Sequence, residues 1–98
     1  MTSFSANQPT GAQKRLFESV SPALRGSFAR DILSDYRRWV LKQIDAASKA
    51  GATEYLREME KLKERLAGEF DLAVRGDAGV IKRSLTEYRE FLLEINKR

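Results

Sequence analysis

The sequence predicts an all-α fold: a small helical bundle of three principal helices that includes a C-terminal antiparallel helical hairpin. Two observations support it. Apolar residues recur every three or four positions over most of the chain, and proline or glycine stands where each helical stretch would begin or end. With 98 residues, of which 42% are hydrophobic, the chain has room for one modest core. We expect a flexible N-terminal tail at 1–11 and a single helical domain at 12–98.

The first principal helix is expected at 22–50. Ser21 followed by Pro22 suits an N-cap and a first helical position, because the N–H that proline lacks is not needed there. Gly51 is placed to end the helix in the left-handed conformation. The apolar residues cover an arc of about 200°, wider than one neighbouring helix requires. They are Leu24, Phe28, Ile32, Leu33, Tyr36, Trp39, Val40, Ile44 and Ala47.

The other two principal helices are expected at 53–75 and 78–97, joined as the antiparallel hairpin. In both, apolar residues are separated by steps of three and four, which is close to a coiled-coil seam. Gly76 is placed to stop the first of these helices, and Asp77 to cap the second. The sequence Arg-Gly-Asp at 75–77 is therefore explained as the turn of the hairpin, without an adhesion function.

The residue types that are missing restrict the possible chemistry. The chain contains no histidine and no cysteine, so it has no imidazole base, no thiolate nucleophile and no nitrogen or sulfur ligand for zinc. We expect no catalytic activity and no cofactor. The first residues lack the basic start and apolar middle expected of a secretory signal, and no apolar run approaches the roughly 20 residues that span a bilayer. We expect a cytoplasmic protein without a membrane partner.

The one enzymatic alternative rests on glutamate pairs. Glu87 and Glu90 lie three residues apart on a predicted helix, where their carboxylates could share a magnesium ion. These two residues resemble the Glu-x-x-Glu pair of the all-helical nucleotide pyrophosphatases, which implies a magnesium-dependent nucleotide hydrolase. Basic residues are interleaved with the acidic ones, as on a solvated helix face, which favours a purely structural reading of the pair.

Charge raises a second alternative, a helical nucleic-acid-binding protein. The net charge is +4, and residues 1–50 hold 8 basic and 4 acidic side chains against 10 and 10 in residues 51–98. Arginines beside aromatic rings, as at 35–43, could contact phosphate and stack on a base. On a helical wheel, however, Tyr36 and Trp39 fall within the apolar arc, and acidic residues interrupt the positive field. The possible nucleic-acid contacts are Arg30, Arg37, Arg38 and Lys42.

Protein–protein interaction by helix packing is the function that the sequence favours. The wide apolar arc at 22–50, with leucines that fall outside the seams, indicates more apolar surface than one small bundle covers. We expect an adaptor or assembly module, most simply a homodimer or otherwise a binder of a helical protein. The rival arrangement is a monomer in which residues 12–20 fold over this face. The predicted interface residues are Trp39, Leu41, Leu72 and Leu93.

Overall fold

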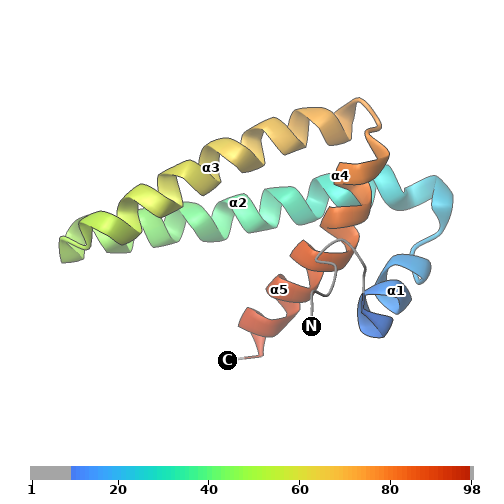
Figure 1. Cartoon of the computed structure of the whole chain (residues 1–98), viewed down its shortest axis with the longest axis horizontal. Helices are drawn as coiled ribbons and strands as arrows, with labels where there is room; N and C mark the ends of the chain where they lie inside the picture. Colours follow the sequence, from blue (N-terminus) through green and yellow to red (C-terminus); the bar gives the residue numbers. More distant parts are fainter. Residues whose placement is uncertain (1–9, 98) are drawn as a thin grey trace, which may run out of the picture.

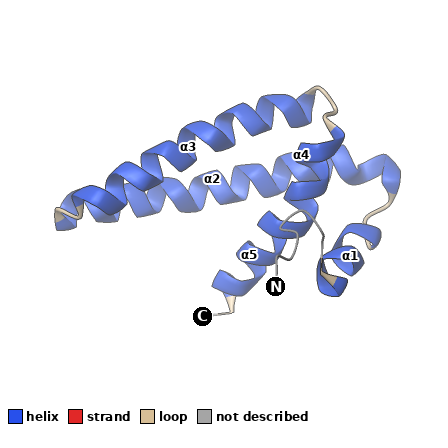
Figure 2. Cartoon of the chain, in the orientation of Figure 1, coloured by secondary structure: helices blue, strands red, loops and turns tan. Residues whose placement is uncertain are grey.

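The computed structural model of the chain describes residues 10–97 (Figure 1). Regular structure within this range is helical and includes no strand (Figure 2), which confirms the predicted all-α fold. The predicted tail at 1–11 lies outside the described residues except for its last two. These are Thr10, the N-cap of α1, and Gly11, the first residue of α1 (Gly11–Glu18). No helix within 10–97 combines the length and apolar character needed to cross a membrane.

The longest elements, α2 (Arg25–Ala50) and α3 (Thr53–Val74), run antiparallel and side by side (Figure 1). A short 3-10 helix, η1 (Pro22–Leu24), leads into α2, so the expected start at 22 and end at 50 agree with the structure. Gly51 has a φ of 70°, a left-handed conformation that residues with a Cβ rarely adopt, and its N–H bonds back to the carbonyls of the last turn. This pair forms the most extensive helix contact in the molecule.

The C-terminal segment is one continuous helix in three parts: α4 (Ala78–Arg83), the π-helix η2 (Ser84–Tyr88) and α5 (Arg89–Asn96). Gly76, with a φ of 85°, ends α3, and the Asp77 carboxylate caps α4 by accepting the Val80 N–H at 2.9 Å. The segment therefore forms a hairpin-like pair with α3. With α1 added, the molecule has one more helix than the three principal ones expected.

The C-terminal segment crosses the α2/α3 pair instead of running along it (Figure 1). The end of the pair that carries Gly51 projects beyond the crossing, and we call this end the tip. On its other side the segment contacts α1. Because it lies between two layers, four of the five residues of η2 are buried, and two of them have hydroxyls bonded to carbonyls one turn earlier. The four are Ser84, Leu85, Thr86 and Tyr88.

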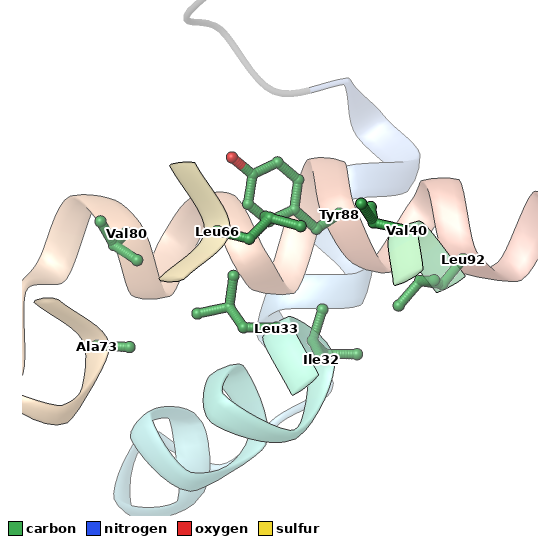
Figure 3. Close-up of a cluster of buried hydrophobic side chains, with 8 residues drawn as sticks. All are labelled: Ile32, Leu33, Val40, Leu66, Ala73, Val80, Tyr88 and Leu92. Carbon is green, nitrogen blue, oxygen red and sulfur yellow. The ribbon is translucent and has the colours of Figure 1, made fainter. Parts of the chain in front are cut away.

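The core lies where α2, α3 and the C-terminal segment meet. Leu33 from α2, Leu66 from α3 and Tyr88 from η2 come together at its centre (Figure 3). Both leucines are only 1% exposed. Burial of each such side chain stabilises the fold by about 1.5–3 kcal/mol relative to exposure, so this contact holds the crossing in place.

Polar contacts dock α1 onto the C-terminal segment, and α1 itself contains no buried residue. Gln13 donates from Nε2 to Oε1 of Glu90 at 2.9 Å, and Arg89 donates to the carbonyl of Leu16 at 3.0 Å. The guanidinium of Arg25 lies 4.1 Å from the ring centroid of Phe17. Residues 12–20 therefore pack mainly against η2 and α5 and contact α2 at Arg25 in its first turn, whereas the rival arrangement has them over the wide apolar face of the long helix.

Candidate interaction surface

One hollow, the α2–α3 groove, lies along the contact between these two helices. It measures about 460 Å³ and takes apolar side chains from both helices, with charged side chains beside them. An apolar groove bordered by charges suits a helix that has one apolar face. Its lining includes the apolar residues Leu41, Leu66 and Phe70 and the charged residues Arg37, Arg38 and Asp71.

A second hollow, the α2–α5 groove, lies on the other flank of α2. It measures about 440 Å³ and combines apolar and basic side chains, among them Trp39 and Leu93. Arg38 lines both hollows. The two grooves are therefore neighbours that share one strip of α2, and together they make a single two-groove surface. The basic residues of the second groove are Arg38, Lys42 and Arg89.

Between the two grooves runs the exposed ridge of α2, which we define by Asp31, Asp35, Arg38 and Lys42. Arg38 lines both grooves, Asp35 and Lys42 line the α2–α5 groove, and Asp31 lies one turn before Asp35 on the same side of the helix. All four side chains are exposed. Arg38 donates from Nη1 to Oδ1 of Asp35 at 2.9 Å, with the two side chains 66% and 56% exposed. An ion pair this exposed contributes at most about 1 kcal/mol, so both groups stay available to a partner.

An aromatic cluster fixes Trp39 in the wall of the α2–α5 groove. Its ring meets Phe91 edge-on with centroids 5.1 Å apart, and Phe91 stacks on Tyr36 at 5.0 Å. Tyr36 in turn meets Tyr88 edge-on at 5.2 Å. Burial raises the pKa of Tyr36, with a smaller lowering by Arg65. Such pairs fix ring orientation, so Trp39 is a rigid side chain in the wall of the groove.

The structure brings together three of the four predicted interface residues. Trp39 and Leu93 line the α2–α5 groove, and Leu41 lines the α2–α3 groove. Leu41 and Leu93 are 42% and 46% exposed. Leu72 is similarly exposed, at 40%, but it lies about 160° around α3 from Phe70, away from the groove.

The predicted nucleic-acid contacts divide in a similar way. Arg37, Arg38 and Lys42 lie on the two-groove surface, with Arg38 already paired to Asp35. Arg30 is half-buried and lines neither groove. The basic and the apolar candidates from the sequence therefore line the same two grooves, which makes this a mixed surface.

Of the two glutamates of the enzymatic alternative, one takes part in a structural contact. Glu90 accepts the hydrogen bond from Gln13 that docks α1, and Glu87 is exposed within η2. Within residues 10–97 there is no group of three or more acidic side chains arranged to hold a metal ion. Of Glu87 and Glu90, Glu90 therefore makes a structural contact that joins α5 to α1.

Sequence reasoning did not identify a buried carboxylate, Glu69 on α3, which is 8% exposed. Its Oε1 accepts the Tyr88 hydroxyl at 2.6 Å, and its Oε2 accepts from Arg83 at 2.8 Å and from Arg65 at 3.3 Å. Arg65 also donates to the Tyr88 oxygen at 3.2 Å. Burial, followed by the hydrogen bond and negative charge of Glu69, raises the pKa of Tyr88 to about 12. We call these four residues the Glu69 cluster.

The Glu69 cluster ties α3 to the C-terminal segment at the crossing. Two guanidinium groups and one phenol satisfy the carboxylate oxygens, so the buried charge is neutralised in place. None of its four residues lines either groove, and their contacts join α3 to the C-terminal segment. Comparisons of the chain with protein-family models, curated proteins and solved structures find no match.

Proposed function

We propose that this chain is a helical protein-interaction module that assembles by packing helices, with the two-groove surface of α2 as its binding site. A second copy of the chain is the simplest partner. The observation that carries the proposal is the pair of apolar grooves on either side of one exposed ridge, left uncovered by α1. Each groove is bordered by charges, so it would both bury apolar area and fix the orientation of a bound helix.

The apolar residues of the two grooves supply the expected affinity. Leu41 and Leu93 are each a little under half exposed. Completing the burial of one such leucine adds about 1 kcal/mol, because full burial is worth about 1.5–3 kcal/mol. In a symmetric pair every contact occurs twice, so a few such residues with Trp39 as a rigid anchor support association.

Leu41→Glu is expected to convert the assembled protein to monomers while leaving the fold intact. The new carboxylate would have to enter an apolar groove, whereas in the monomer it stays in water. Multi-angle light scattering over a range of concentrations gives the mass, and circular dichroism reports the helix content. Leu72→Glu is the matched control, because Leu72 is about as exposed as Leu41 but lies outside the two grooves.

Two results would count against this assignment. A wild-type protein that remains monomeric at the highest concentration would refute self-association. Dissociation by Leu72→Glu with no effect of Leu41→Glu would place the interface on the opposite side of α3.

Nucleic-acid binding is a second candidate, since Arg37, Arg38 and Lys42 lie on the same surface. Asp31 and Asp35 lie among them and oppose phosphate, so we expect no binding tighter than micromolar at physiological salt. Filter binding to labelled DNA and RNA at several salt concentrations tests this. Submicromolar binding that falls steeply with salt, and that weakens in Arg37→Ala, would favour this candidate over a protein partner.

A further inference from the structure

The charges along the ridge of α2 complement themselves. Asp31 and Asp35 are followed, seven residues later in each case, by Arg38 and Lys42. At about 100° per residue these four positions fall within an arc of about 60°, so they form one line along the helix. The line is acidic toward the N-terminal end of α2 and basic in its middle.

We infer that two copies pair through this ridge, with their α2 helices antiparallel about a two-fold axis. In this register Asp35 faces Arg38 of the second copy, and Asp31 faces Lys42 of the second copy. One register satisfies both pairs because Asp31 precedes Asp35 by four residues and Lys42 follows Arg38 by four. The inference rests on the proposed function and gives the orientation and the contacts of its simplest partner.

Symmetry and charge together select this arrangement. In a two-fold dimer every contact occurs twice, so the two ion-pair types give four pairs across the interface. A parallel pairing in register would instead set Asp35 against Asp35 and Arg38 against Arg38, which is repulsive. A foreign acidic helix would be repelled by Asp31 and Asp35, and a foreign basic helix would be repelled by Arg38 and Lys42.

The grooves provide the apolar part of the same interface. The two ridges meet along the ion pairs, and the hollows of about 460 Å³ and about 440 Å³ lie on the two flanks of each α2, beside that contact. Leu41 lies beside the ridge in the α2–α3 groove, where an antiparallel α2 from the second copy would cover it. A stable interface takes about 800 Å² per partner, a small part of the 6594 Å² surface of the chain.

Charge reversal on each side of one pair provides the test. Asp35→Lys and Arg38→Asp each set like charges opposite one another twice in a homodimer, so each alone should weaken dimerisation about tenfold or more. An equimolar mixture of the two variants should form heterodimers, because the introduced lysine then faces the introduced aspartate and the unchanged Arg38 faces the unchanged Asp35. Recovery to within about threefold of the wild-type dissociation constant is expected.

Sedimentation at low salt measures the dissociation constants of the wild type, of each variant and of the mixture, and circular dichroism checks that each variant stays helical. Glu58→Lys is the net-charge control for Asp35→Lys, since it makes the same change of charge at an exposed site on α3. Weak single variants with recovery in the mixture support the antiparallel ridge pairing. A wild-type dimer that tolerates both reversals, or variants that weaken without recovery in the mixture, would overturn it and leave self-association standing. A monomeric wild type would overturn both.

Discussion

Glu69→Gln is expected to lower the free energy of unfolding by about 2–3 kcal/mol, measured by chemical denaturation. Glutamine keeps the size of the side chain but removes the charge that Arg65 and Arg83 share, and its amide N–H groups cannot accept their hydrogen bonds. Removing one partner of a fully buried ion pair costs about 3–5 kcal/mol. A smaller loss is expected for Glu69→Gln than for a fully buried pair, because the side chains of Arg65 and Arg83 are 60% and 36% exposed and can turn to water.

Glu58→Gln is the matched control, because Glu58 is exposed on the same helix. It should change the stability by less than about 0.5 kcal/mol. Combining Glu69→Gln with Tyr88→Phe should cost less than the sum of the single changes, since the two side chains share a hydrogen bond of 2.6 Å. Equal stability losses at Glu58 and Glu69 would show that the cluster does not hold the crossing.

Raising the pH from 10 to about 12 is expected to remove a stabilising contribution of Tyr88. Its pKa is raised to about 12 in the fold, whereas a tyrosine in the unfolded chain ionises near 10. The folded state therefore keeps a proton that the unfolded state loses. The contribution is fully present below pH 10 and is lost as the pH rises to about 12. The expected contribution of Tyr88 is on the order of 1–2 kcal/mol. It is smaller than the full rise in the pKa would give, because solvent screens the charges of the neighbouring guanidinium groups.

Denaturation curves of the wild type and of Tyr88→Phe, recorded at steps between pH 9 and 12, measure this contribution. The stability difference between the two proteins should shrink across that window, because phenylalanine does not titrate. Phenolate absorbance provides a second readout, in which one tyrosine of the wild type ionises late and disappears from the titration of the variant. A pH-independent difference would contradict the assignment.

Helix boundaries could be predicted from the sequence because local chemistry determines them. Gly51 and Gly76 adopt the left-handed conformation at helix ends, and Asp77 caps the next helix through its own side chain. Which helices pack most closely could not be predicted in the same way. The apolar seams of α3 and of the C-terminal segment have nearly the same spacing, which favours pairing these two with each other, whereas in the structure α3 packs most extensively against α2. The crossing depends on how bulky side chains such as Tyr88 pack against the other helices, and the spacing along the sequence does not determine this.

The two-groove surface was partly visible in the sequence, and the Glu69 cluster was not. Trp39, Leu41 and the arginines of 37–38 stand out because large apolar and basic residues share one short stretch. Glu69 follows the buried Leu66 by three residues, the spacing that places it beside the seam, but an acidic residue in a charged helix is usually solvated. Its partners come from distant positions, so only the folded chain shows that the carboxylate is buried.

The crossing of the C-terminal segment also divides the molecule into parts of unequal local stability. Near the crossing, amide groups are protected by a third helix, whereas at the tip the turn at Gly51 is flanked by exposed residues and only Ala47 is buried close by. Local opening of the tip exposes little apolar surface, so it requires less free energy than global unfolding. Within the α2/α3 pair, amide hydrogen exchange should therefore be fastest near Gly51 and slowest around Leu33 and Leu66. The tip of the α2/α3 pair can fray and re-form while the rest of the domain stays folded.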